Sequence, residues 1–385
     1  MASDPRATRA AAEISRINAF FPIMTILGNR IAAARPFEGK TIAVSGHLTT
    51  LTGALVRELT LGGGEWVVCS VNDATTDQGV VQMLRDNGVT VYTLGNRNDA
   101  YREALKHKPN LIADVGAEIM SALAKSDPDL IENLQGAIEV TRSGVSKLRA
   151  LESLPFGVVN INDGLLKPAI ENRHGVGEGL WHAIQTQTGM HLSGRRVAVV
   201  GYGPVGKGVA AYARAAGANC EVIEPSPIRR LVAHYDGYPT PSLEDCLGRV
   251  GVVVTCTGRK SALNVEKLRT ARNGLVLVNA GHGSDEIDVK GIRAASNAVD
   301  QVSDHVVRYS LEDGPTVAVL AKGNPLNIVT NAGSPEPVLL HFALLGLTLE
   351  WLSSQRLSAG EHPVPLDLED AAAELALQAL GMAHG

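Results

Sequence analysis

The stretch Arg196–Lys207, which reads RVAVVGYGPVGK, decides the fold that the chain around it must follow. Val197–Val200 form a short apolar, mostly β-branched run, which is typical of a parallel strand buried on both faces. The glycines that follow, Gly201, Gly203 and Gly206, have the spacing G-x-G-x-x-G. The first permits a tight turn, the second lets the backbone approach a pyrophosphate, and the third lets helix and strand pack closely. The stretch therefore predicts a phosphate-binding turn between a strand and a helix.

The segment after these glycines completes a dinucleotide-binding unit. Residues 207–218 are rich in alanine and predict a helix whose N-terminus faces the phosphates, with Val205 in the turn before it. A second strand over 220–223 ends at Glu224. A carboxylate there accepts hydrogen bonds from the ribose hydroxyls of NAD and repels the 2′-phosphate of NADP. NAD is therefore the expected cofactor, and Arg229, one of two adjacent arginines, keeps NADP open as the alternative.

The composition excludes several classes of protein. At 385 residues the chain is long enough for two or three domains, each with its own core. A net charge of −5 gives no basic footprint, so we expect no nucleic-acid partner. The 4 cysteines form no C-x-x-C pair, so we expect buried, reduced thiols, no metal site and a cytoplasmic location. No stretch has the length of a membrane span, so no membrane partner is expected.

Strand-like and helical runs alternate through two blocks of the chain. This alternation predicts an α/β protein with parallel sheets and right-handed crossovers. We assign residues 1–188 to a parallel α/β substrate-binding domain and residues 189–332 to a Rossmann-type NAD-binding domain. Residues 333–385 are expected to form C-terminal helices, over 338–352 and 366–380, that return to the substrate domain.

Motifs in both blocks resemble those of the S-adenosyl-L-homocysteine hydrolase family over nearly the whole chain. They are GHLTT at 46–50, NINDGLLKPAIEN at 160–172, GYGPVGKG at 201–208 and NAGHGSDEID at 279–288. The resemblance implies that tightly held NAD oxidises the 3′-hydroxyl of a nucleoside to a ketone, which acidifies the C4′ hydrogen. A base then removes that hydrogen, the substituent on C5′ is expelled, and hydride returns from NADH.

The resemblance also implies roles for individual residues. Lys167 would assist the oxidation, because desolvation lets a lysine act as a base. Asn172 would work beside it, and Glu171 would contact the sugar. His47 would act as acid or base near C4′ and C5′, and His282 would line the leaving-group side.

Further contacts follow from the same resemblance. The implied substrate contacts are Thr49, Asp114, Glu139, Asn162 and Ser334. The implied cofactor contacts, beside the glycine turn and Glu224, are Thr141, Arg142, Ser143, Thr257, Asn279 and Asn327.

The chain also departs from the family at its sugar-binding residues. Val115 stands where the family has a catalytic aspartate, and Val140 stands where a glutamate holds the sugar hydroxyls. Since a buried carboxylate is costly without its ligand, we expect the sugar edge facing these valines to differ from that of the family substrate. The family's C-terminal Lys and Tyr extension has no counterpart after the 366–380 helix, and Arg142 is a candidate to replace its contact with the cofactor phosphate.

Three functions fit these matches and departures. The first is a dehydratase or lyase that eliminates the C5′ group and releases a 4′,5′-unsaturated nucleoside, as expected in the biosynthesis of angustmycin-type antibiotics. The second is an ordinary adenosylhomocysteine hydrolase, and the third is a non-catalytic NAD-binding homologue. In each case the expected partners are a small nucleoside and further copies of the chain, as a dimer or tetramer.

Overall fold

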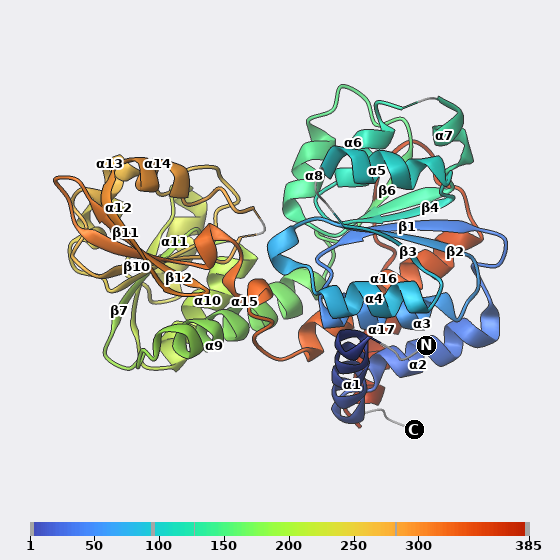
Figure 1. The fold of residues 1–385 in the computed structure, drawn as a ribbon, viewed down its shortest axis with the longest axis horizontal. Coiled ribbons are helices and arrows are strands. Elements are labelled where there is room, and N and C mark those ends of the chain that lie inside the picture. The colour runs from blue at the N-terminus through green and yellow to red at the C-terminus, as the bar shows by residue number, and fades with distance from the viewer. Residues whose placement is uncertain (1–3, 94–96, 127, 282, 382–385) are drawn as a thin grey trace. The chain divides into compact units, whose positions relative to one another are not determined.

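The structure, a computed structural model, describes residues 4–93, 97–126, 128–281 and 283–381. The chain divides into two compact units, each built around its own sheet (Figure 1). Unit 1 comprises Met1–Lys167 and Pro335–Gly385, and unit 2 comprises Pro168–Ser334.

The sheet of unit 1 is parallel throughout. Its strands run, from one edge to the other, β14 (Gly360–Pro363), β6 (Gly157–Asn160), β5 (Gly136–Glu139), β4 (Leu111–Asp114), β1 (Thr41–Gly46), β2 (Glu65–Ser70) and β3 (Thr90–Tyr92). The central strands are buried along almost their whole length, as the apolar runs predict for a sheet covered on both faces.

Helices cover both faces of this sheet (Figure 1). They are α1 (Pro5–Phe20), α2 (Ile23–Ala34), α3 (Thr50–Thr60), α4 (Gln78–Asp86), α5 (Arg97–Lys106), α6 (Glu118–Leu123), α7 (Pro128–Asn133), α8 (Arg142–Arg149), α16 (Glu336–Ser353) and α17 (Leu366–Ala379), with a 3-10 turn, η1, at Asp73–Thr75. Helices α3, α4 and α16 lie on one face and α5 and α6 on the other. Helices α16 and α17 both contact α2, so the C-terminal helices lie in this unit.

The sheet of unit 2 is mixed. Its order is β11 (Ser296–Ser303), β12 (Val306–Leu311), β13 (Thr316–Leu320), β10 (Leu275–Asn279), β9 (Val252–Thr255), β7 (Arg196–Val200) and β8 (Asn219–Ile223). The helical segments are the π-helix η2 (Lys167–Gly175), α9 (Val176–Thr188), α10 (Pro204–Ala215), α11 (Pro227–Tyr235), α12 (Leu243–Leu247), α13 (Val265–Leu268), α14 (Val289–Ala294), η3 (Ala321–Gly323) and α15 (Leu326–Val329).

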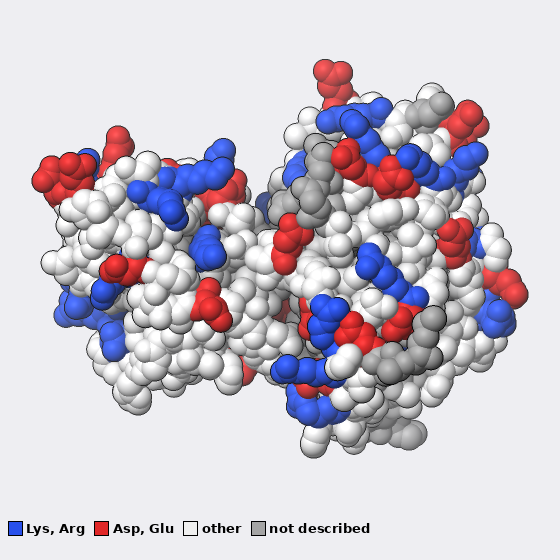
Figure 2. Space-filling model, in the orientation of Figure 1, with Lys and Arg blue, Asp and Glu red and all other residues white. Residues whose placement is uncertain are grey.

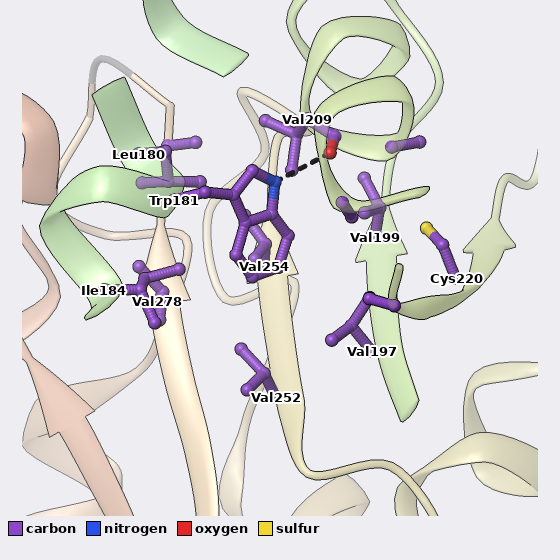
Figure 3. Close-up of a cluster of buried hydrophobic side chains, with 14 of the residues drawn as sticks. Leu180, Trp181, Ile184, Val197, Val199, Val209, Cys220, Val252, Val254 and Val278 are labelled. Atoms are coloured by element: carbon purple, nitrogen blue, oxygen red, sulfur yellow. Dashed lines mark hydrogen bonds between the residues drawn. The ribbon is translucent and has the colours of Figure 1, made fainter. Parts of the chain in front are cut away.

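The core of unit 2 shows why the domain boundary expected at 188/189 was wrong. Trp181, on α9, lies among the valines of β7, β9 and β10, and its Nε1 donates a hydrogen bond to the carbonyl of Val209 at 2.8 Å (Figure 3). A Cβ at Gly208 would lie 2.0 Å from the carbonyl oxygen of Arg173, so α10 and η2 approach backbone to backbone. Helix α9 therefore belongs to the NAD-binding unit, whose first residue is Pro168.

Two elements differ from the purely parallel arrangement that was expected. Strands β11 and β12 form an antiparallel hairpin at the edge of the unit 2 sheet, and β12 also pairs antiparallel with β13. Strand β11 is almost fully exposed, so its residues carry no apolar run that would reveal it. Strand β14 lies in the polar stretch between the two expected C-terminal helices. Backbone pairing with β6, rather than burial, makes it a strand.

Surface charge and helix length are the two features relevant to nucleic-acid and membrane partners. On the face shown in Figure 2, basic and acidic side chains are interspersed rather than gathered by sign. In the described ranges no single helix is long and apolar enough to cross a membrane, and only the pair α1 and α2, bent by 99°, passes that test when taken together.

Candidate functional site

The turn between β7 and α10 has the geometry that a pyrophosphate requires. Gly201 has a φ of +101°, which favours glycine, and a Cβ at Gly206 would lie 2.0 Å from the carbonyl oxygen of Gly201. A Cβ at Gly203 would meet nothing within 4 Å, so this side of the turn is open. Gly203 caps α10 without a side-chain hydrogen bond, and Val205 follows in the first turn. The turn therefore fits the phosphates of a dinucleotide at a helix N-terminus.

Glu224 lies where the ribose of that dinucleotide is expected. Its carboxylate is 6% exposed and accepts the backbone N–H groups of Tyr202, at 2.8 Å, and Ser226, at 2.9 Å. One donor on each oxygen leaves a lone pair on each for a ribose hydroxyl. Arg229 is exposed on α11, and its role toward the cofactor stays a prediction.

The loops after β9 and β10 are held by two side chains, that of Asn279 at the end of β10 and that of Glu286 in the loop after it. Asn279 is fully buried; its amide nitrogen donates to the carbonyls of Gly283 and, at 2.9 Å, Gly323, while its oxygen accepts from Gly281 at 2.7 Å. Asn279 thus organises the loops around the expected cofactor position. The direct cofactor contact that the sequence predicted for its side chain would compete with these bonds.

Glu286 is a residue that the sequence reasoning missed. It is fully buried and accepts both the backbone N–H and the hydroxyl of Thr257 at 2.8 Å, together with the N–H of Gly258 at 2.8 Å. The predicted cofactor residue Thr257 is therefore positioned by Glu286. The only sequence signal was an acid within the 279–288 motif.

Asn327, on α15, is the predicted nicotinamide contact, and its side-chain oxygen is able to accept a hydrogen bond from the cofactor. Its Oδ1 is buried and has no hydrogen-bond partner among the residues that the structure describes. A buried amide oxygen without a partner is costly, and the carboxamide group of NAD would satisfy it. His282, which was expected on the leaving-group side, lies outside the described residues.

In unit 1 the predicted site residues follow adjacent strands at one edge of the sheet. His47 comes just after β1, Val115 just after β4, Val140 just after β5 and Asn162 shortly after β6, and these strands are neighbours in the order β6-β5-β4-β1. Parallel strands bring the loops at their carboxyl ends together, which is where open α/β sheets bind ligands.

The geometry around His47 defines how its ring is oriented. Its Nδ1 lies 2.7 Å from the hydroxyl of Thr75, and that hydroxyl lies 3.0 Å from the carbonyl of Asn72, to which it donates. Because the single hydroxyl hydrogen of Thr75 is used in this way, its oxygen accepts from the Nδ1–H of His47. The neutral ring then carries its lone pair on Nε2, which is the form that acts as a base. Thr75 is a positioning residue that no sequence motif indicated.

Asp114 and Glu139 are fully buried, and both are engaged by the chain itself. Asp114 accepts the hydroxyl of Ser45 and, at 2.9 Å, the N–H of Met120. Glu139 accepts the N–H groups of the loop residues 116 and 117 at 3.1 and 2.7 Å, and both the N–H and the hydroxyl of Thr141 at 2.7 Å. Both side chains are fully buried, and these backbone and hydroxyl donors show that they brace the loops; their role as substrate ligands stays a prediction.

The two carboxyl groups face each other across neighbouring strands, since Asp114 pairs with Glu139 in the sheet register. Burial raises the pKa of Asp114 to about 6. Burial, followed by the nearby charge of Asp114, raises the pKa of Glu139 to about 8. The residues that follow them, Val115 and Val140, carry no charge toward a substrate.

Lys167 opens the π-helix η2, on which Glu171 and Asn172 also lie. The lysine is only 7% exposed, and π-helical turns are frequent at functional sites. Asn162, in the loop before this helix, is 7% exposed, and its amide donates to Asp163 at 2.8 Å. The structure thus places a buried lysine in the motif that the family resemblance assigns to the oxidation step.

The remaining predicted residues lie at loop and helix ends. Thr49 precedes α3 without a capping bond, and Ser334 is exposed, with its N–H bound to Glu178 at 2.8 Å. Thr141 caps α8 and contacts Ser143 at 3.2 Å. Arg142 is exposed and pairs with Asp163 at 3.9 Å. Thr141, Arg142 and Ser143 belong to unit 1, and their cofactor role stays a prediction.

Comparison with known proteins identifies the family to which this site belongs. The family described as "S-adenosyl-L-homocysteine hydrolase, NAD binding domain" matches residues 172–333. The adenosylhomocysteinase of Thermoplasma acidophilum is 33% identical over 94% of this chain and 91% of its own length. The S-inosyl-L-homocysteine hydrolase of Methanopyrus kandleri is 32% identical over 94% and 88%, and the adenosylhomocysteinase of a Nostoc species is 32% identical over the same shares.

Among solved structures, the A chain of dipicolinate synthase from Bacillus subtilis has a TM-score of 0.47 and 15% identity, covering 83% of this chain and 98% of that one. The sequence relatives named above align over nearly the whole chain. The chain therefore belongs to the S-adenosyl-L-homocysteine hydrolase family and is an NAD-dependent member of it.

Proposed function

We propose that this protein carries out the oxidation and elimination sequence of its family on a nucleoside. The substrate loses the proton of its 3′-hydroxyl and the hydride on C3′, then the C4′ proton, and then the group on C5′. The observation that carries this proposal is the alignment with adenosylhomocysteinases over 94% of the chain, glycine turn and Lys167 motif included. When bound, NAD supplies a reversible hydride acceptor, so the overall reaction needs no external oxidant.

Two residues of unit 1 have geometry suited to the proton transfers. Lys167, 7% exposed, is the proposed base for the 3′-hydroxyl proton, because it lies in the motif that aligns with the oxidation step of the family. His47 presents Nε2, the basic nitrogen of the tautomer set by Thr75, for the C4′ proton or for protonating the leaving group. In unit 2, Asn327 would hold the nicotinamide carboxamide through its unpartnered Oδ1.

The first candidate reaction is hydrolysis of an S-nucleosidyl-homocysteine. The relatives support it, because their names describe hydrolases whose substrates carry adenosine or inosine. In this reaction the thiol of homocysteine leaves from C5′, water adds to the same carbon, and hydride returns to C3′.

A second candidate, dehydration, is favoured by a specific observation on the unit 1 loops. The strand-end positions beside the two self-bound acids carry Val115 and Val140, so these two positions offer no carboxylate to a ribose hydroxyl. A nucleoside of a different sugar, such as a ketohexose, would meet an apolar wall there. Loss of the C4′ hydrogen and the terminal hydroxyl as water forms a 4′,5′ double bond, and the returning hydride restores C3′. The product is a 4′,5′-unsaturated nucleoside of the angustmycin type.

One experiment separates these candidates. NAD-loaded protein would be mixed in turn with S-adenosyl-L-homocysteine, S-inosyl-L-homocysteine and a ketohexose nucleoside, while NADH absorbance is followed and products are identified by mass spectrometry. Release of homocysteine would establish hydrolysis, and a product lighter by one water would establish dehydration. If no nucleoside reduces the cofactor and no product forms, the proposal fails and a non-catalytic, NAD-binding role takes its place.

A further inference from the structure

A cavity of about 230 Å³ in unit 2 is lined by more basic than acidic side chains. It is lined by Arg173, Tyr202, Lys207, Ala211, Arg214, Asp236 and Tyr238, all of which belong to this unit. In the described part of the chain, none of its three cationic side chains forms an ion pair with a carboxylate. With Asp236 as its one acid, the lining has a formal charge of three minus one, or +2.

The fold holds these cations in place. Lys207, Ala211 and Arg214 are spaced by four and three residues on α10, so they share one face of the helix. The guanidinium carbon of Arg214 lies 4.3 Å from the ring centroid of Tyr238, and its Nη1 donates to the carbonyl of Asp236 at 2.7 Å. The ammonium of Lys207 lies 5.6 Å from the ring centroid of Tyr202. Arg173 comes from η2, whose backbone packs directly on α10 at Gly208.

A buried hydroxyl supplies an independent sign of a missing ligand. Tyr238 is 3% exposed, and its hydroxyl has no hydrogen-bond partner among the residues described. The neighbouring hydroxyl of Tyr202 is used, because it donates to Asp236 at 2.8 Å. An unsatisfied buried hydroxyl costs about 1–3 kcal/mol. The Tyr238 hydroxyl lies beside cations that form no ion pair within the described ranges, so a bound anion with acceptor oxygens would satisfy the hydroxyl and the cations together.

We propose that this cavity binds the phosphate group of a small molecule. Guanidinium groups match phosphate oxygens in pairs, the lysine adds a point charge, and the Tyr238 hydroxyl donates a further hydrogen bond. A water molecule occupies about 30 Å³, so the cavity accommodates a tetrahedral oxyanion with several waters.

The site differs from the cofactor phosphate site of the same unit. That site is the open side of the turn at Gly203, at the N-terminus of α10, whereas the cavity lies along the side of this helix. Tyr202 connects the two, since its N–H binds Glu224 and its hydroxyl binds Asp236. Tyr202 therefore contacts both the ribose-binding acid and the acid of the cavity.

The test is calorimetric titration of the NAD-loaded protein with inorganic phosphate, at an ionic strength fixed with chloride. Loading with NAD keeps the glycine turn filled, so that phosphate cannot bind there. We expect saturable binding of one phosphate, weakened at least about tenfold by Arg214→Gln and about fivefold by Tyr238→Phe. Arg293→Gln, which removes the same charge from an exposed position on α14, should bind as the unaltered protein does.

Each result decides the proposal. Adenosine 5′-monophosphate in place of phosphate shows whether the ligand is free phosphate or a nucleotide, since a nucleotide site would bind it more tightly. Absence of saturable binding, or equal affinity in the Arg214→Gln, Tyr238→Phe and Arg293→Gln proteins, would overturn it. Because Tyr238→Phe removes a single oxygen, it keeps the test valid if Arg214→Gln fails to fold, which thermal unfolding would reveal.

Discussion

Both units hold the loops after their parallel strands with buried polar side chains, but they use different chemistry at the strand ends. In unit 1 the last residues of β4 and β5 are Asp114 and Glu139, two acids that face each other. In unit 2 the last residue of β10 is Asn279, a neutral amide, while the acid that binds the neighbouring loop is Glu286. An amide donates and accepts without titrating, whereas two adjacent buried acids repel when both are charged. The stability of the unit 1 loops should therefore change with pH as Asp114 and Glu139 titrate.

The largest expected effect comes from removing the buried lysine of unit 1. Lys167→Met should lower the rate of cofactor reduction about 10²–10⁴-fold, because the base for the 3′-hydroxyl is lost. Bound NAD should be unaffected, since the dinucleotide turn lies in unit 2. The measurement is single-turnover NADH absorbance, with the exposed Lys106→Met as the control. Full activity in Lys167→Met would remove the lysine from the proposed mechanism.

The next effect distinguishes the two units by whether a core substitution releases NAD. Trp181→Ala should cost about 3–5 kcal/mol of stability through lost packing and a lost hydrogen bond, and it should reduce NAD content. Phe37→Ala, a comparably buried site in unit 1, should cost a similar amount while retaining NAD. Thermal unfolding and the NAD content of the purified proteins measure both. Equal NAD loss in the two variants would contradict the assignment of α9 to the NAD-binding unit.

A pH series examines the acid pair directly. The raised pKa values mean that in the folded protein this pair holds protons which the unfolded chain releases, so the contribution of the pair to stability is greatest at low pH and is lost as the pH rises toward about 8. Glu139→Gln should flatten this fall, with a gain on the order of 1–3 kcal/mol at high pH relative to the unaltered protein. Denaturant unfolding at several pH values measures it, and Glu103→Gln on the surface of α5 is the control. An unchanged slope in Glu139→Gln would show that the pair does not titrate in this range.

The smallest effect concerns the orientation of His47. Thr75→Val removes the acceptor for Nδ1–H and should lower the elimination rate about tenfold, with a shifted pH–rate profile, because the tautomer is no longer fixed. Thr75→Ser keeps the hydroxyl and should restore both rate and profile. If Thr75→Val and Thr75→Ser behave alike, the hydroxyl does not position the ring.

Much of this architecture could be predicted from local sequence. The apolar run of β7 indicated a buried parallel strand, and the alternation of strand-like and helical runs indicated parallel sheets in both blocks; the structure has that strand and both sheets. The spacing of Gly201, Gly203 and Gly206 indicated the dinucleotide turn, since backbone conformation and close approach depend on glycine itself. The exposed β11 and the polar β14 could not be predicted, because partners distant in the chain, rather than their own side chains, make them strands.

For the site, the sequence by itself determined the family, the cofactor and the motifs that contain Lys167 and His47. Only the tertiary structure decided what those motifs contact. It showed that Asp114 and Glu139 are bound by the backbone of the loops beside them, that Glu286 and Thr75 position the predicted residues, and that three cations surround one cavity. The reason is physical: a motif records which side chains are present, whereas the hydrogen bonds they make depend on donors from segments that only the fold brings within reach.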